Sequence, residues 1–269
     1  MYEQYWKLRE KPFENDQNTA FFYYSREHRE AFVRLLYAIM ESKPCAVLLG
    51  EAGCGKTFLM NALARQLADR HVRVAMVRDP AQDPLGILRQ IAKGFGIADG
   101  GASKAEIVAS LEQHLSQFGD RGACAVLFID DADTIENDRT YEELRLLNNL
   151  EERGRPLLTM VLAGQPRLRE QLRRIPALAQ RVAVSFTIPP LSEEESIAYI
   201  GHRLKQVEGD RQIFDVRALR EVHRGSRGVP RVLNHLCDLS LLLCASEGRR
   251  CVDSRIVARA LEDLKELER

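Results

Sequence analysis

Short apolar runs alternate with segments of helical periodicity along the first 190 residues of the chain. The apolar runs predict five strands, at residues 45–49, 72–77, 124–129, 157–163 and 184–188. The segments between them predict helices at residues 25–41, 56–69, 84–94, 103–118 and 140–153. Because strands that alternate with helices form parallel sheets covered on both faces, the pattern indicates an α/β fold with a parallel sheet core.

The strand pattern stops at Pro189 and Pro190, where we place a domain boundary. The remaining sequence predicts four helices, at residues 192–208, 215–223, 230–246 and 253–267. Ser192 and Glu195 form a capping box, in which each side chain satisfies a free amide at the start of a helix. We therefore expect an N-terminal segment plus α/β core at residues 1–190 and an all-helical lid domain at residues 191–269.

The octapeptide GEAGCGKT, residues 50–57, lies between a predicted strand and a predicted helix. Its glycines allow a tight turn that exposes backbone amides to phosphate, and the helix start also favours an anion. Lys56 would bind the β- and γ-phosphates, and the Thr57 hydroxyl would coordinate Mg²⁺. A chance glycine-rich turn is the alternative, but the flanking strand and helix are the context that this P-loop motif requires. We predict that ATP or ADP binds at Gly50, Glu51, Ala52, Gly53, Cys54, Gly55, Lys56, Thr57 and Phe58.

A second motif, AVLFIDDAD, ends a predicted strand in acidic residues. Asp130 is predicted to hold Mg²⁺, mostly through water, opposite the phosphate loop. Asp131 would then orient the attacking water, and because many such enzymes use the longer glutamate there, hydrolysis is expected to be slow. A solvated acidic turn is the alternative interpretation, and the accompanying phosphate loop favours the catalytic one.

Two arginines are candidates for phosphate contact. Arg231, in the sequence GVPR, lies near a predicted helix start in the lid, where its guanidinium fork could reach phosphate. Arg181 precedes the last predicted strand and could neutralise charge at the γ-phosphate of a neighbouring subunit, which requires an oligomer. An ordinary surface ion pair is the alternative for either arginine taken alone.

The composition excludes several classes of protein. The 39 basic and 39 acidic residues cancel, so wholesale electrostatic binding to nucleic acid is not implied. The six cysteines lack zinc-site spacing and are expected to be buried thiols, except that Cys54 could be a thiolate sensitive to alkylation. Because no signal core and no apolar run of membrane-spanning length is visible, we predict a cytoplasmic chain, with the inner face of the inner membrane as a further location.

The order of the blocks GEAGCGKT, LFIDDAD, ELRLLNNLEE, LAGQPRL, LAQRV and GVPRVLNHLCD resembles the ExeA-like ATPases of general secretion pathway component A, a branch of the AAA+ superfamily of P-loop NTPases. The N-terminal sequence is similar too, so the resemblance covers nearly the whole chain. It implies that Gln165 is the first sensor of the γ-phosphate, Arg231 the second sensor and Arg181 the arginine finger. It also implies that residues 24–29 approach adenine, although the aromatic run at residues 21–24 could equally pack in a core.

The chain departs from that family at two acidic positions. Asp131 stands where the family usually has glutamate, and Asp133 stands where glutamine or histidine is common. Longer family members also carry a membrane span and a periplasmic peptidoglycan-binding region, neither of which is present in this sequence. We therefore expect either a stand-alone member or an N-terminal fragment of a longer protein.

Three functions fit these observations. The first is an ATP-dependent switch or motor that self-associates as a ring or filament and serves a secretion or envelope-assembly protein. The second is a DNA-associated regulator, because transposon target-selection ATPases are similar in the same core motifs. The third is a nucleotide-binding scaffold that hydrolyses poorly.

A basic face for DNA could come from either of two groups of arginines, at positions 167, 169, 173 and 174 or at 217, 220, 224 and 227. For the first group we favour a subunit interface.

Overall fold

The computed structural model describes residues 2–15, 21–68, 70, 72–98, 103–119, 125–152, 154–209 and 211–267. The chain divides into two units. The sheet unit comprises Arg26–Ala52 and Lys56–Ile188, and the helical unit comprises Met1–Ser25, Gly53–Gly55 and Pro189–Arg269. The second boundary falls at the predicted proline pair, but the first 25 residues group with the helices rather than with the sheet.

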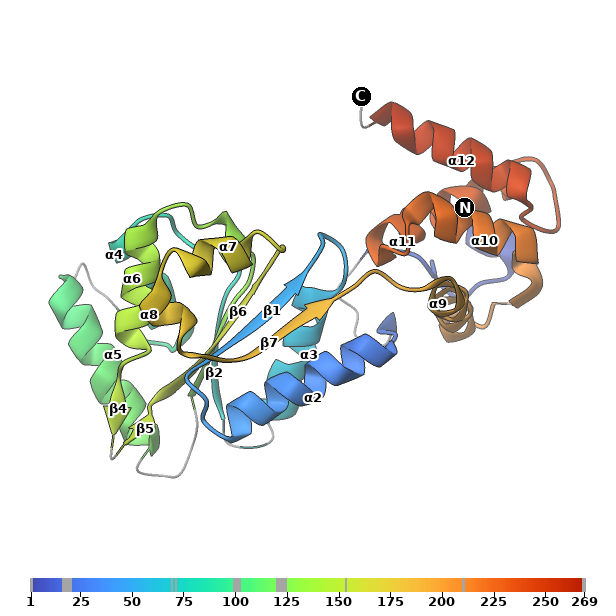
Figure 1. Ribbon diagram of the computed structural model, residues 1–269. Coiled ribbons are helices and arrows are strands. Elements are labelled where there is room, and N and C mark those ends of the chain that lie inside the picture. Colours follow the sequence, from blue (N-terminus) through green and yellow to red (C-terminus); the bar gives the residue numbers. More distant parts are fainter. Residues whose placement is uncertain are drawn as a thin grey trace. The chain divides into compact units, whose positions relative to one another are not determined.

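The sheet unit is built on five parallel strands in the order β2-β3-β6-β1-β7 (Figure 1). The strands are β1 Cys45–Gly50, β2 Arg73–Val77, β3 Ala125–Ile129, β6 Leu158–Gly164 and β7 Val182–Ile188. Every residue of β1, β3 and β6 is buried, as expected for the middle strands of a sheet covered on both faces. The predicted parallel sheet is therefore confirmed.

Helices cover both faces of this sheet. Figure 1 shows α2 and α3 on one face, and α4, α5, α6, α7 and α8 on the other. Alternation along β1 serves both layers, because Cys45, Val47 and Leu49 join the core beneath α4 to α8 and the residues between them point the opposite way. The helices are α2 Arg26–Met40, α3 Lys56–Ala68, α4 Pro84–Gly94, α5 Lys104–Gly119, α6 Asp138–Leu147, α7 Leu168–Arg173 and α8 Pro176–Ala179.

One predicted helix is shorter than expected. The prediction ran from residue 140 to 153, whereas α6 ends at Leu147 and a small antiparallel hairpin follows, formed by β4 Glu151–Glu152 and β5 Arg155–Pro156. Gly154, with φ of +76°, occupies the left-handed conformation that the hairpin turn requires. Residue 153 itself, like Cys124 at the start of another predicted element, lies outside the described residues.

The helical unit contains α1 Tyr2–Trp6, α9 Glu193–Gln206, α10 Val216–Ser226, α11 Pro230–Ser246 and α12 Ser254–Leu267. The predicted capping box at the start of α9 is confirmed. The Glu195 amide donates to the Ser192 hydroxyl at 3.2 Å, and the Ser192 amide donates to the Glu195 carboxylate at 3.3 Å. Asp215 caps α10 by accepting a hydrogen bond from the Ala218 amide at 2.6 Å.

A buried arginine explains why the N-terminal segment belongs to the helical unit. Arg203 of α9 is only 4% exposed, and its guanidinium donates to the carbonyl oxygens of Pro12 at 2.5 Å and Glu14 at 2.6 Å. The guanidinium carbon also lies 4.6 Å from the centre of the Phe21 ring. These partners are far apart in sequence, so no local pattern could have assigned Met1–Ser25 to this unit.

Candidate nucleotide-binding site

Three of the predicted site segments meet at one edge of the sheet. β1 leads into the phosphate loop at Gly50, β3 leads into Asp130, and β6 leads into Gln165. Leu49 pairs with Gly164 and Ile129 pairs with Leu162, so the three strands end at nearly the same level. Ligands of open parallel sheets bind outside the carboxyl ends of the strands, which is where these segments lie.

The phosphate loop has the backbone conformation that its glycines predict. Gly53 and Gly55 have φ of +84° and +90°, a region that other residues rarely adopt. Lys56 is buried at the first position of α3, and its ammonium donates to the carbonyl oxygens of Gly50 at 2.8 Å and Glu51 at 3.2 Å. A positive charge, loop amides and a helix start are thus combined as a phosphate site requires.

Thr57 and Asp130 supply the oxygen atoms that would hold Mg²⁺. The Thr57 hydroxyl donates to Asp130 Oδ2 at 2.5 Å, and the other oxygen of this buried carboxylate accepts from the Asp131 amide at 3.0 Å. Within the described ranges, no group of three or more His, Cys, Asp or Glu side chains could hold a metal. A hydroxyl and one carboxylate, completed by water and phosphate oxygens, are the coordination that Mg²⁺ commonly takes.

Asp131 lies just past the buried strand, with its side chain exposed to solvent. Its φ of 48° and ψ of 37° place it in the left-handed region, which aspartate tolerates better than most residues. The turn that follows, η2 Ala132–Thr134, carries Asp133 back into the protein. An exposed carboxylate beside the buried Asp130 can reach solvent water, so the water-orienting role of Asp131 stays a prediction with compatible geometry.

Asp133 is a site-adjacent residue whose role the sequence did not reveal. Its side chain is 1% exposed. The sequence marks Asp133 only as a departure from the family pattern. Its Oδ1 accepts from the Gln165 amide at 2.9 Å, and its Oδ2 accepts from Arg167 Nε at 2.7 Å. The motif IDDAD shows Asp133 as a third acid, but no local sequence pattern identifies its partners Gln165 and Arg167.

The two arginine candidates lie on different elements. Arg231 is exposed in the first turn of α11, where Pro230 opens the helix. Arg181 directly precedes β7, whose first residue pairs with Cys45, the first residue of β1. Arg181 is thus at the opposite end of the strands from the phosphate loop, and its guanidinium donates to the Asn148 carbonyl at 2.9 Å. The phosphate roles of both arginines, like the γ-phosphate role of Gln165, stay predictions.

The aromatic side chains at residues 21–24 lie in two environments, one buried and one exposed. Phe21 is buried in the core of the helical unit, and the Tyr23 ring packs edge-on against Tyr199 at 6.0 Å between centres. Tyr24 is 38% exposed and meets the Phe22 ring at 4.5 Å. Core packing therefore accounts for Phe21 and Tyr23, and Tyr24 is the ring whose exposure is compatible with the predicted approach to adenine.

Five of the eight arginines considered for DNA binding have a side-chain partner within the chain. Arg167 and Arg174 form ion pairs with Asp133 and Asp138, and Arg169 donates to the Thr187 hydroxyl. In the other group, Arg220 pairs with Glu193 at 3.3 Å and Arg224 with Glu221 at 2.7 Å. Acidic partners reduce the positive field of both groups, which weakens the case for a focused basic face.

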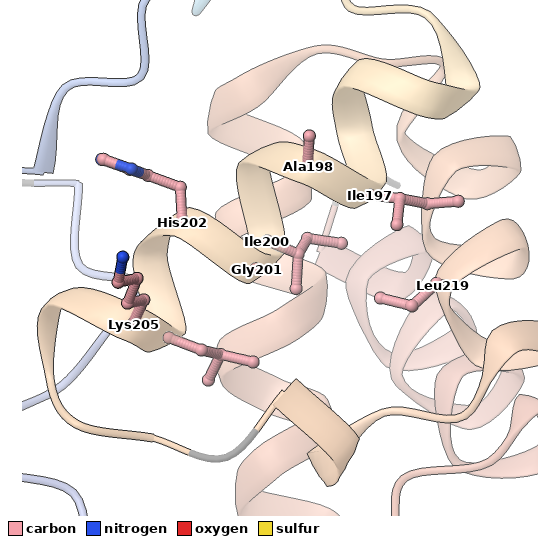
Figure 2. A pocket seen from close by; sticks show the side chains of 8 residues that line it. Ile197, Ala198, Ile200, Gly201, His202, Lys205 and Leu219 are labelled. Atoms are coloured by element: carbon pink, nitrogen blue, oxygen red, sulfur yellow. The ribbon is translucent and has the colours of Figure 1, made fainter.

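A pocket of about 400 Å³ lies in the helical unit, beside α9 and α10. Figure 2 shows apolar side chains of α9, including Ile197 and Ile200, beside Leu219 of α10, with His202 and Lys205 further along α9. Burial lowers the pKa of His202, and the nearby Arg203 and Lys205 charges add to this effect. None of the predicted nucleotide-binding residues lines this pocket.

Four of the five described cysteines are buried as expected, whereas Cys251 is partly exposed. The buried cysteines are Cys45, Cys54, Cys237 and Cys244, and burial raises the pKa of Cys45 to about 12. Cys54 is buried within the phosphate loop, so a reagent could alkylate it only after the loop moves. Among the helices that the structure describes, none combines the length and apolar character needed to cross a membrane.

The amino-acid sequence matches a known family and a known relative. The model of a family described as "AAA domain" matches residues 39–172. General secretion pathway protein A of Aeromonas hydrophila is 33% identical over 251 residues, which cover 92% of this chain and 46% of that protein. This chain therefore spans less than half the length of that relative.

Two solved structures are similar in fold. The Aeropyrum pernix ORC2 protein, in complexes with ADPNP and ADP, is 16% identical with a TM-score of 0.67 over 91% of this chain and 71% of that chain. Drosophila ORC bound to DNA is 20% identical with a TM-score of 0.72 over 95% of this chain and 64% of that chain. At these identities the likeness shows the fold alone, which is the predicted sheet core followed by helices.

Proposed function

Because this chain belongs to the AAA-domain ATPases related to general secretion pathway protein A, we propose that it is an ATP-dependent assembly switch in a secretion or cell-envelope system. ATP binding would favour self-association into a ring or filament, and hydrolysis would release it. The system named here is taken from the relative, of which this chain spans 46%. A cytoplasmic location, including the inner face of the inner membrane, is part of the same proposal.

The chemistry proposed for one subunit follows from the arrangement at the strand ends. The Lys56 ammonium, which donates to the Gly50 and Glu51 carbonyls, would exchange these contacts for the β- and γ-phosphates. Thr57 and Asp130 would hold Mg²⁺, which when bound neutralises phosphate charge. Asp131 would orient water toward the γ-phosphate, and Gln165 and Arg231 would sense that phosphate.

The observation that carries the assembly proposal is the position of Arg181. A strand of seven residues spans roughly 20 Å, and Arg181 lies at the end of β7 opposite to the phosphate-loop end of β1. This separation is too long for an arginine side chain to cross, so any contact between Arg181 and a γ-phosphate must be made to a second copy. Such a contact would make hydrolysis depend on assembly.

Light scattering with mass determination tests this proposal. The purified chain would be measured with ADP, with ATP plus Mg²⁺, and with ATP plus Mg²⁺ and duplex DNA. We expect a larger mass with ATP and Mg²⁺ alone, and Lys56→Ala should remain at the mass seen with ADP. A monomer under every condition would overturn the assembly switch and the trans role of Arg181 together.

The DNA arm of that experiment addresses the alternative function. Arg169 and Arg173 of α7 are exposed, so both side chains are accessible to a phosphate backbone. Assembly only in the presence of DNA, weakened by added salt and by charge reversal at these two positions, would favour the DNA-associated regulator. Assembly that is indifferent to DNA favours the secretion-type switch.

A further inference from the structure

The buried carboxylate of Asp133 joins two of the strand ends that form the candidate site. It follows β3 by a short turn, and both of its oxygens accept hydrogen bonds from the segment after β6. One donor is the backbone amide of Gln165, the predicted sensor of the γ-phosphate, at 2.9 Å. The direction of the Gln165 side chain therefore depends on where this carboxylate lies.

Neighbouring groups hold the Asp133 turn in place. The Gln171 side-chain amide donates to the carbonyl oxygens of Asp133 and Ile135, both at 3.0 Å. The buried Tyr141 hydroxyl donates to the Ala132 carbonyl at 2.6 Å. Burial and the nearby Asp133 charge raise the pKa of Tyr141 well above its usual range, so the phenol keeps its proton and remains a donor. The position of the carboxylate is thus set by hydrogen bonds to the backbone of its turn as well as by the donors to its own oxygens.

A glycine makes the close approach possible. A Cβ atom added to Gly164, the last residue of β6, would lie 2.7 Å from Asp133 Oδ1 and 3.1 Å from its Cβ. Any larger residue at position 164 would therefore push the carboxylate away from the Gln165 amide. The conformation of Gly164 is not left-handed, so its role here is to leave space rather than to permit an unusual turn.

We propose that Asp133 is a positioning residue that couples the Mg²⁺-binding end of β3 to the γ-phosphate sensor Gln165. The carboxylate acts through Gln165 and does not touch nucleotide. Arg167, whose side chain is 58% exposed, supplies the counter-charge that stabilises the carboxylate in a buried position. This inference rests on the proposed ATP turnover at the same site. It also assigns a function to Asp133, which stands where the family commonly has glutamine or histidine.

The first test removes or displaces the Asp133 carboxylate, which makes both the hydrogen bond to Gln165 and the ion pair with Arg167. Asp133→Ala removes both, and Gly164→Ala displaces the carboxylate without removing it. For each variant, kcat and KM for ATP and the dissociation constants of ADP and a slowly hydrolysed ATP analogue would be measured. We expect kcat to fall about 10- to 100-fold in both, as for loss of a hydrogen bond to a charged acceptor. We also expect weaker binding of the ATP analogue relative to ADP, with ADP affinity unchanged; the melting temperature should fall in both variants, so all measurements are made well below it.

A paired substitution provides the rescue. Asp133→Asn keeps an oxygen for the Gln165 amide but directs an NH₂ group at Arg167, so the single variant should be impaired. Combining it with Arg167→Gln removes the opposed donors and should restore most of kcat and the preference for the ATP analogue. Asp138→Asn is the matched control, because Asp138 is an exposed acid whose ion pair, at 3.2 Å, is with Arg174 rather than with Arg167.

Two results would overturn the inference. One is wild-type kcat and nucleotide preference in both Asp133→Ala and Gly164→Ala. The other is equal loss of ADP and ATP-analogue affinity, which would show a structural role alone. Failure of the proposed function is a separate result, since nucleotide preference is measured on the chain at low concentration whether or not ATP causes assembly.

Discussion

Arg203→Met should release the N-terminal segment from the helical unit. The substitution keeps much of the volume of the side chain but leaves the carbonyl oxygens of Pro12 and Glu14 without their donor. Hydrogen bonds to charged groups contribute about 1.5–3 kcal/mol each, and the guanidinium–Phe21 contact adds about 1 kcal/mol. Methionine recovers part of this by avoiding the desolvation of a charge, so we expect a net loss of about 3 kcal/mol.

Hydrogen exchange measures this loss where it occurs. The Arg9 amide donates to the Val207 carbonyl at 3.2 Å, so this amide reports on the attachment of the segment. A loss of about 3 kcal/mol corresponds to exchange that is roughly 100-fold faster. Amides of the sheet unit should be unaffected, because they belong to a different unit.

Arg220→Met is the matched control for this measurement. Arg220 is also an arginine of the helical unit, but its side chain is 60% exposed and its partner Glu193 lies at the surface. Exposed ion pairs contribute about 0–1 kcal/mol, so this variant should exchange nearly as slowly as wild type. If Arg203→Met also stays within about 1 kcal/mol of wild type, the buried guanidinium is not what holds the segment, and the reasoning is refuted.

Three further predictions concern turnover, assembly and pH. Asp131→Glu should raise kcat in a steady-state ATPase assay, because the added methylene brings the carboxylate nearer the attacking water; an unchanged kcat would argue against the water-orienting role. Arg181→Ala should lower ATP turnover at concentrations where the chain assembles but keep ATP affinity in a binding assay, and weakened binding would contradict a role in trans. Burial lowers the pKa of His202, so the unfolded chain binds its proton more readily and stability should fall as pH drops below about 6.5. Urea unfolding at pH 7.5 and 5.5 should show a smaller loss in His202→Gln, and equal losses would contradict the assignment.

The fold could be predicted because its signals are local. The buried strands appear as continuous apolar runs, and a box such as Ser192 with Glu195 identifies a helix start from four residues. The helix α8 was missed because four residues are too few to establish a period. The hairpin after α6 was missed because its two strands have only two residues each, too few to show a strand pattern.

The site could be predicted only in part, for a related reason. Lys56, Thr57 and Asp130 sit in short motifs whose chemistry is recognisable from a few neighbours. The contact between Asp133 and Gln165 joins two loops that are adjacent only because β3 and β6 pair in the sheet. Arg203 and the N-terminal segment show the same limit, since the partners lie at opposite ends of the chain.

The strand order also determines when this protein can fold. β1 occupies the sheet between β6 and β7, both of which are encoded much later in the chain. At roughly 5–20 residues per second, a ribosome needs several seconds between emitting β1 and completing either neighbour. During that interval the apolar segment Cys45–Gly50 has no partner strand, and it exposes free backbone groups and an apolar surface. The phosphate loop therefore forms late in synthesis, and nascent chains of this protein should depend on chaperones that bind unpaired strands.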